Sequence, residues 1–204
     1  MQTRLYLTPA DHGRPLSWEE FASADAEEGY RYEMIGGRVE VSPQPNMPHD
    51  VVLMQLTRSL LVYSAQHDDI LPYVSTHARV FLPDPPEGTT APEPDLAGYT
   101  ESFPEGTPIA ETDWRKVSPA FVVEILSEDT EDKDLDRNRR LYLQVPSIQE
   151  YWIVNPRATA DEPVMIVFPR RGRRWGRQRT VLWGATYTTP LLPGFSLVLV
   201  PHVG

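Results

Sequence analysis

The spacing of apolar residues changes along the chain, and each change predicts a different kind of element. Between residues 50 and 66 apolar side chains recur every three or four positions, which is typical of one face of a helix. Residues 73–82 instead alternate apolar with polar side chains, which predicts a strand. Residues 121–126 are apolar on both faces except at Glu124, as expected of a central strand that is covered on both sides.

Capping and turn residues predict the remaining elements. Ser17-Trp-Glu-Glu20 fits a capping box, so a short helix begins there. Gly36-Gly37 separates two short strands of a hairpin over residues 32–41. A helix over about residues 132–145 joins two strands, which predicts a right-handed crossover. Further strands are predicted at 94–99, 150–155, 164–168, 175–183 and 195–200.

These elements predict one α+β domain over residues 1–204. The length of 204 residues suits one domain with a proper core and is short for two. The Pro-rich segment 83–94 has no complete core on either side, so we interpret it as a surface loop or lid and not as a domain linker. The expected architecture is a mixed sheet flanked by helices, with a hairpin near the N-terminus and a β-rich C-terminal part.

Composition narrows the classes of function. The chain has no cysteine, which excludes disulfides, thiolate zinc sites and thiol nucleophiles. It has no apolar run near the ~18 residues of a membrane helix, and its first residues do not predict a signal peptide. We therefore expect a cytoplasmic protein with no membrane partner. The net charge of −10 argues against indiscriminate binding to a polyanion.

Two acids stand out for their positions. A carboxylate inside an apolar strand is costly without a partner, and Glu124 is so placed. Asp95 begins the strand predicted at 94–99. If the two strands are neighbours, Mg²⁺ or Mn²⁺ would relieve the repulsion between both carboxylates. Alternatively, Asp95 caps a turn and Glu124 pairs with an arginine. Spacing alone favours the cap for Asp95 and leaves both alternatives open for Glu124.

The order of several motifs resembles a known family. A Tyr-Glu-x-Ile-x-Gly hairpin precedes a loop that ends in His49 and a long helix. The long helix is followed, in order, by Pro-Asp, by Val-Val-Glu-Ile-Leu-Ser-x-x-Thr, by a helix with a tyrosine and by Pro-Ser-x-Gln-Glu-Tyr-Trp-x-Val. This order resembles the Uma-two family of restriction-endonuclease-like proteins in the PD-(D/E)XK nuclease superfamily. The match covers about residues 15–170 and is most specific at 119–130 and 142–156.

The resemblance implies a restriction-endonuclease-like fold, Mg²⁺- or Mn²⁺-dependent hydrolysis of DNA and a homodimer. It implies that Asp95 and Glu124 are the paired metal ligands, and that Glu33 and His49 belong to the catalytic site. The alternative to a catalytic role for His49 is the ordinary hydrogen-bonding role of a histidine in a loop. The family pattern has a lysine four residues before the helix tyrosine, Tyr142, and this chain has Asn138 there.

Residues 170–179 hold six arginines and no acid. They could follow a phosphate backbone, with Trp175 stacking on bases. A solvated hairpin tip and a contact with an acidic surface in an oligomer are the alternatives. The candidate nucleic-acid-binding residues are Arg170, Arg171, Arg173, Arg174 and Arg177.

Two functional hypotheses follow from the sequence. The first is a metal-dependent endonuclease that acts on DNA, with Asn138 in the position of the usual lysine. The second is a nuclease-fold protein that has lost catalysis and acts as a binding or regulatory module. The replacement of the lysine and the negative net charge motivate the second.

Overall fold

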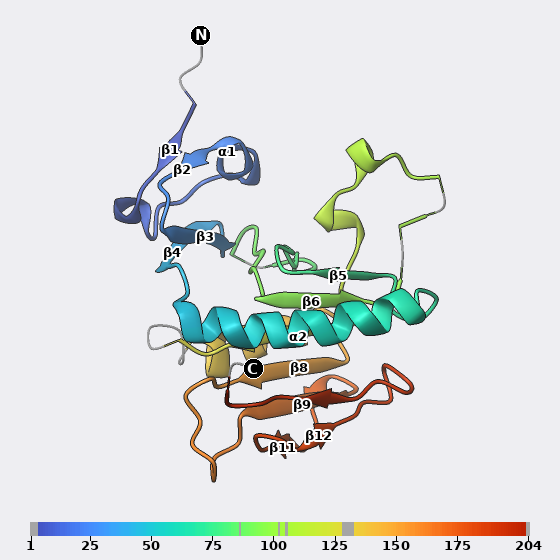
Figure 1. Cartoon of the computed structure of the whole chain (residues 1–204). Coiled ribbons are helices and arrows are strands. Elements are labelled where there is room, and N and C mark those ends of the chain that lie inside the picture. The colour runs from blue at the N-terminus through green and yellow to red at the C-terminus, as the bar shows by residue number, and fades with distance from the viewer. Residues whose placement is uncertain (1–3, 86, 102, 105, 128–132, 203–204) are drawn as a thin grey trace.

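A mixed sheet forms the centre of the structure (Figure 1). The computed structural model describes residues 4–202 apart from 86, 102, 105 and 128–132. The strands follow the spatial order β10-β9-β8-β7-β6-β5, and β11 also pairs with β9. Their bounds are β5 Tyr73–Ser75, β6 Leu96–Tyr99, β7 Phe121–Ile125, β8 Glu150–Val154, β9 Met165–Arg171, β10 Arg174–Trp175 and β11 Arg179–Val181.

The centre of the sheet contains the predicted crossover. Strands β7 and β8 pair in parallel, with Glu124 opposite Ile153, while the neighbouring pairs are antiparallel. The connection between them contains a π-helical segment, η4 (Lys133–Asn138), which continues into α3 (Arg139–Leu143). The predicted helix over 132–145 is thus confirmed in position, but its first part, η4, is a π-helix, which is wider than an α-helix. Residues 128–132, where its predicted start lies, are outside the described residues.

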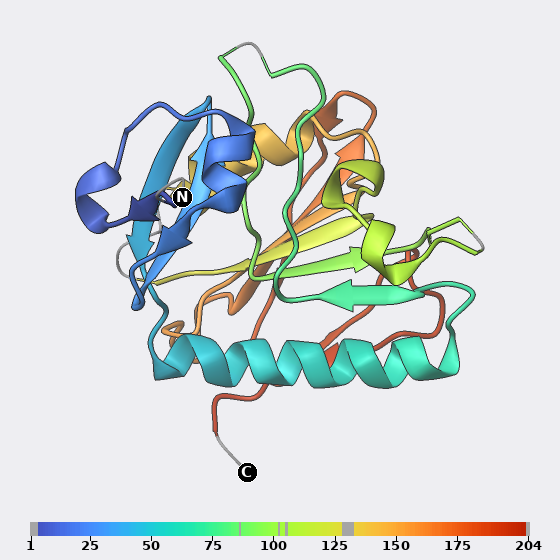
Figure 2. The same ribbon diagram turned by 90° about the horizontal axis from the view of Figure 1, so that it is seen from above.

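Helix α2 (Met47–Gln66) covers one face of the sheet (Figures 1 and 2). Its apolar face packs with the odd-numbered residues of β7, with Trp152 of β8 and with the C-terminal segment. The prediction of a helix start at residue 50 was three residues late. Asn46 caps the helix and Pro48 lies in its first turn, where proline is tolerated. His49 is therefore a helical residue and not the end of a loop.

The opposite face of the sheet packs against η4 and α3, which lie across the sheet from α2 in Figure 2. Because side chains alternate along a strand, Glu124 lies on the same face as Val122. Val122 packs in the core cluster that contains Tyr142 of α3 and Tyr151 of β8. Glu124 thus belongs to a buried face that is otherwise mostly apolar.

The N-terminal residues form a smaller layered unit beside the sheet (Figure 1). The capping box at Ser17 starts helix α1, and the hairpin turns at Gly36 and Gly37, both with positive φ, as predicted. This unit has its own apolar cluster. Its elements are β1 Tyr6–Leu7, η1 Pro9–Asp11, α1 Trp18–Ser23, β2 Asp25–Ala26, β3 Tyr30–Ile35 and β4 Arg38–Pro43.

The strand predicted over residues 73–82 ends at Ser75, so the prediction was wrong for its second half. Beyond a bend, Val80 and Leu82 donate main-chain hydrogen bonds to Pro92 and Thr90 instead of continuing the ladder. The Pro-rich segment also bonds to the hairpin, since the N–H of Ala91 donates to the carbonyl of Met34. Thr90 and Ala91 are buried, so the end of this segment is a packed connection and not a surface loop.

The C-terminal part is β-rich, as predicted, although its strands are short. Strands β12 (Thr186–Tyr187) and β13 (Leu197–Val198) form a separate antiparallel pair. Two 3₁₀ turns, η2 (Ile109–Glu111) and η3 (Trp114–Lys116), lie between β6 and β7. The α+β class with a mixed sheet is confirmed, while the single domain stays a prediction. Among the helices in the described part of the chain, none has both the length and the apolar character that a bilayer requires.

Candidate active site

Asp95 lies immediately before β6 and is almost completely buried. The Arg31 guanidinium of β3 is 2.6 Å from Oδ1, and Nε2 of His49 is 2.9 Å from Oδ2. The main-chain N–H of Ile125 donates to Oδ2 at 2.7 Å. Three separate segments of the chain therefore converge on one carboxylate.

These contacts determine the ionisation of Asp95. Burial by itself raises the pKa of this carboxyl, because it penalises the charged form. The hydrogen bond from His49, the charge of Arg31 and the Ile125 N–H oppose burial and hold the pKa below its ordinary value of 3.8. In turn, burial lowers the pKa of Arg31, but the charge and hydrogen bond of Asp95, together with the charges of Glu124 and Glu33, outweigh burial and raise that pKa. Asp95 is thus an anion near neutral pH.

Glu124 lies beside Asp95 and is held from the other face of the site. Nδ2 of Asn138 donates to its Oε1 at 2.8 Å, and the hydroxyl of Tyr142 donates to the same oxygen at 2.7 Å. The second oxygen, Oε2, is 3.4 Å from the main-chain nitrogen of Asp95. Because Asn138 and Tyr142 are one helical turn apart, both reach the same carboxylate. Glu124 thus contacts the main chain of Asp95, while the pairing of the two carboxylates around one cation stays a prediction.

Tyr142 remains a neutral hydrogen-bond donor at this position. Burial raises the pKa of its hydroxyl well above 10, and the negative charge of Glu124 raises it further. Asn138 is fully buried and lies at the junction of η4 and α3. The π-helical turn before α3 is a rare feature that frequently occurs at functional sites.

A third buried acid, Glu33, lies on the hairpin strand β3. It accepts a hydrogen bond from the main-chain N–H of Glu93 at 2.9 Å. It also faces Arg137, whose Nη2 is 3.4 Å from Oε2. Nε of Arg137 donates to Oδ1 of Asn138 at 3.1 Å, so Arg137 connects Glu33 to the residue that holds Glu124.

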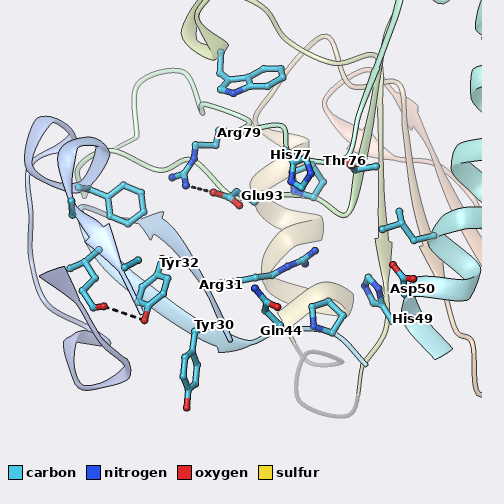
Figure 3. A pocket seen from close by; sticks show the side chains of 18 of the residues that line it. Tyr30, Arg31, Tyr32, Gln44, His49, Asp50, Thr76, His77, Arg79 and Glu93 are labelled. Carbon is cyan, nitrogen blue, oxygen red and sulfur yellow. Dashed lines mark hydrogen bonds and ion pairs between the residues drawn. The ribbon is translucent and has the colours of Figure 1, made fainter. Parts of the chain in front are cut away.

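A pocket of about 830 Å³ opens beside this site, between the N-terminal unit and the sheet (Figure 3). Arg31 and His49, the two side chains that hold Asp95, form part of its wall. Apolar, aromatic, polar and charged groups line the rest, and the ion pair between Arg79 and Glu93 lies across it. A substrate in this pocket would lie against the groups that surround Asp95.

The donor atoms suit a hard divalent cation. Asp95 and Glu124 each offer a carboxylate, and the Glu124 carboxylate contacts the Asp95 main chain. Mg²⁺ is commonly bound by one or two carboxylates together with water and substrate phosphates. Within the described residues, no group of three or more His, Asp or Glu side chains is arranged around a common metal position. Two carboxylates with water therefore fit the group that the resemblance implies.

The structure brings all five predicted catalytic residues into one network. Asp95 contacts His49, Glu124 contacts Asn138, and the two acids meet at the Asp95 main chain. Glu33 joins the network through Arg137. Whether any of these residues takes part in catalysis stays a prediction.

The arginines of the hairpin have different surroundings. Arg171, Arg173, Arg174 and Arg177 are exposed at or near the tip, as predicted. Arg170 is half-buried, and its guanidinium donates to main-chain carbonyls of Tyr142, Leu143 and Val145. Trp175 donates to the carbonyl of Arg139 at 2.8 Å and packs in the core. Arg170 and Trp175 therefore hold opposite ends of α3 through its main-chain carbonyls.

Sequence reasoning missed Arg31, Arg137 and the role of the Tyr142 hydroxyl. Two local signals were present. Arg31 precedes Glu33 by two residues on a strand, so both face the same side. Tyr142 follows Asn138 by four residues on a helix, so both contact the same neighbour. No local signal showed that Arg137 contacts the hairpin, because that contact depends on tertiary packing.

Comparison with known proteins identifies the family and the fold of the chain. A family described as "Uma2: Putative restriction endonuclease" matches residues 18–200. A crystal structure described as "a putative nuclease belonging to DUF820 from Anabaena variabilis" superposes with a TM-score of 0.62 at 16% identity, over 90% of this chain and 95% of that chain. This likeness shows a shared fold of the restriction-endonuclease-like type. A search of curated proteins found no match.

Proposed function

Because the chain belongs to the Uma2 family of restriction-endonuclease-like proteins, we propose that it is an endonuclease that hydrolyses DNA with the help of Mg²⁺ or Mn²⁺. The observation that carries the proposal is the convergence of Asp95 and Glu124 on one buried position. Neighbouring carboxylates repel each other when both are ionised, and a divalent cation relieves that repulsion.

Asp95 and Glu124 are the residues that would hold the cation. When bound, it supplies Lewis acidity at the phosphoryl group and lowers the pKa of water at the site. Tyr142 and Asn138 fix the orientation of Glu124 through Oε1. His49 and Arg31 fix Asp95 in the same way, from the side of the pocket.

The residue at the usual lysine position has a limited role. Asn138 orients Glu124 but carries no charge to offset the negative charge that develops on the phosphoryl group. Arg137, which contacts Asn138, is the nearby cation on the same segment. Arginine stays protonated, so Arg137 can stabilise charge but cannot accept a proton from water.

A cleavage assay tests the proposal. Circular, linear duplex and single-stranded DNA are each incubated with Mg²⁺ or Mn²⁺, and with a chelator. We expect metal-dependent cleavage that is lost in Asp95→Asn and in Glu124→Gln. Asp50→Asn is the matched control, since Asp50 lines the same pocket but is exposed. Cleavage that persists unchanged in Glu124→Gln would place the activity elsewhere.

A second candidate function is a binding or regulatory module without catalysis. Asn138 donates to Glu124 at 2.8 Å in the position where the family pattern has lysine, so the site lacks the usual ammonium. The discriminating variant is Asn138→Lys. If the wild type is inert and this variant gains metal-dependent cleavage, the loss of the lysine explains the inactivity. Wild-type cleavage that depends on Asp95 contradicts this second candidate.

Of the exposed arginines of the hairpin, Arg171 and Arg177 are proposed to contact the DNA backbone, while Arg173 and Arg174 add only a general attraction. The resemblance further suggests a homodimer. Light scattering coupled to size exclusion measures the mass in solution and tests the dimer. The cytoplasmic location stays a proposal, which a fluorescent fusion would test.

A further inference from the structure

A second pocket, of about 460 Å³, lies at the start of β8 and is lined by arginines. Its cationic residues are Arg170, Arg171, Arg177 and Arg179. We refer to it as the arginine pocket. The β7–β8 register places Glu150 opposite Phe121, three residues before the position of Glu124, which is about 10 Å along the strands. The side chain of Glu150 lies on the α2 face, because its neighbour two residues on, Trp152, packs there.

Glu150 holds Arg179 at the wall of the arginine pocket. It is buried, and its Oε1 accepts from Arg179 and, at 3.0 Å, from Thr189. Its Oε2 accepts from Trp152 at 2.9 Å and from the Tyr187 hydroxyl at 2.6 Å. Each oxygen thus has two donors, so this acid serves the structure of the pocket. Nε of Arg179 is buried and has no hydrogen-bond partner among the described residues.

The remaining arginines of the pocket carry charge that no acid cancels. Arg170 donates to main-chain carbonyls, which stabilise a guanidinium without neutralising it. Arg171 and Arg177 form no ion pair with any residue that the structure describes. Four arginines therefore face one fully engaged glutamate, in a chain whose net charge is −10.

The chain is tightly packed beside Pro169 and Arg171, which line the pocket. Gly176 donates a main-chain hydrogen bond to Pro169 at 2.7 Å. A Cβ at Gly176 would lie 2.8 Å from Cγ of Arg171, so the absence of a side chain permits the close approach of that arginine stem. Arg170 is anchored by carbonyls at the end of α3. Arg170 thus supplies positive charge, while the exposed guanidinium groups of Arg171 and Arg177 suit phosphate, which arginine binds through paired hydrogen bonds.

We propose that the arginine pocket binds one phosphate group, either a terminal phosphate or a phosphodiester of a nucleic-acid strand. This site is separate from the acid pair and does not depend on cleavage. It also differs from a diffuse attraction by the hairpin, because Arg173 and Arg174 are exposed on the same hairpin but do not line the pocket.

The matched pairs of arginines provide the test. Binding of a short single-stranded oligonucleotide with a 5′-phosphate is measured by fluorescence anisotropy, with the intact chain in the presence of a chelator. The double variant Arg171→Ala/Arg177→Ala should weaken binding by about tenfold or more, because it removes charge-assisted hydrogen bonds. The double variant Arg173→Ala/Arg174→Ala removes the same charge outside the pocket and should weaken binding by about twofold at most, through screened attraction only.

Equal weakening in both double variants would overturn the proposed phosphate site, since binding of the oligonucleotide would then depend on net charge alone. The absence of binding in the wild type would overturn it as well. Competition by inorganic phosphate, lost only in the pocket variant, supports the assignment. An oligonucleotide with a 5′-hydroxyl distinguishes the sources: weaker binding identifies a terminal phosphate, and equal binding identifies the backbone. Because the chelator prevents metal-dependent cleavage, the outcome is independent of the proposed nuclease activity.

Discussion

Single residues around Glu124 show how a buried acid is kept in a mostly apolar layer. Oε1 accepts from Asn138 and Tyr142, and Oε2 lies near the Asp95 main chain. Removal of one donor leaves part of the desolvation cost of a charged group without compensation. The residues that support this site therefore affect stability as well as any activity.

Tyr142→Phe tests this support without a large change of shape. It removes the hydroxyl that donates to Glu124 at 2.7 Å, so we expect it to lower the free energy of unfolding by about 1–3 kcal/mol. Urea denaturation measures the change. Tyr99→Phe is the control, since the Tyr99 hydroxyl is buried without a partner among the described residues and its loss should cost little. Equal losses in both variants would contradict the role assigned to Tyr142.

The lowered pKa of Asp95 predicts how the free energy of unfolding changes with pH. Burial raises its pKa, but His49, Arg31 and the Ile125 N–H outweigh burial and lower it. A carboxyl with a lowered pKa stabilises the fold above the pKa of the unfolded chain, about 3.9. That stability is lost as the pH falls through the lower, folded pKa.

The comparison of wild type with Asp95→Asn isolates this contribution. The difference in unfolding free energy should be constant above about pH 5 and should shrink below about pH 4. Urea denaturation at several pH values measures it. Asp50→Asn is the control, because Asp50 is exposed and should show no such trend of comparable size. A difference that grows in acid would contradict the lowered pKa.

At the scale of elements, strand β6 depends on a glycine in its interior. A Cβ at Gly98 would lie 2.2 Å from two ring atoms of Phe121 on the neighbouring strand. That ring is buried and stacks on Trp152 with centroids 4.8 Å apart, so it has little freedom to move. Gly98 thus permits close packing of the ring between the strands.

Gly98→Ala should therefore destabilise the protein by about 1–3 kcal/mol through overpacking, which urea denaturation measures. The double variant Gly98→Ala/Phe121→Leu provides the diagnostic comparison. Phe121→Leu should cost less in the Gly98→Ala background than in the wild type, because the smaller side chain relieves the clash. Strict additivity of the two changes would show that the predicted contact with Phe121 is not the cause.

The elements that sequence predicted well are those set by local patterns. The capping box at Ser17, the Gly36-Gly37 turn and the apolar strand around Glu124 depend on neighbours in sequence. Residues 76–82 alternate like a strand in sequence, but their main chain bonds to residues 90–92. That pairing cannot be predicted from local sequence, because it depends on where the chain folds back after the Pro-rich segment. The start of α2 was missed because a Met-Pro-His sequence resembles a loop until Asn46 is identified as its cap.

The same distinction applies to the candidate site. The acid pair was predictable from two strands and a family resemblance. The partners Arg31 and Arg137 were not, since each connects the N-terminal hairpin to a distant segment. Tertiary contacts of this kind have no sequence period.

On the scale of the whole molecule, the hairpin, α2, the sheet and the η4–α3 segment meet at the acid pair. Arg31 and Arg137 attach the hairpin to it from two directions, through Asp95 and through Glu33. A ligand that binds between Asp95 and Glu124 would therefore act on contacts among all these parts. Its binding energy should appear in the stability of the entire fold, because it binds the native state and not the unfolded chain.

Thermal unfolding with Mn²⁺ tests this linkage. At about 100 times the dissociation constant, bound metal adds about 2.7 kcal/mol, which corresponds to a rise in Tm of about 5–10 °C for a chain of this size. The chelated protein should have the lower Tm. In Glu124→Gln the rise should nearly vanish, since one of the two carboxylates is neutral, whereas Asp50→Asn should retain it because its side chain lies outside the pair. An equal rise in Glu124→Gln would mean that Mn²⁺ binds to other groups and not between Asp95 and Glu124.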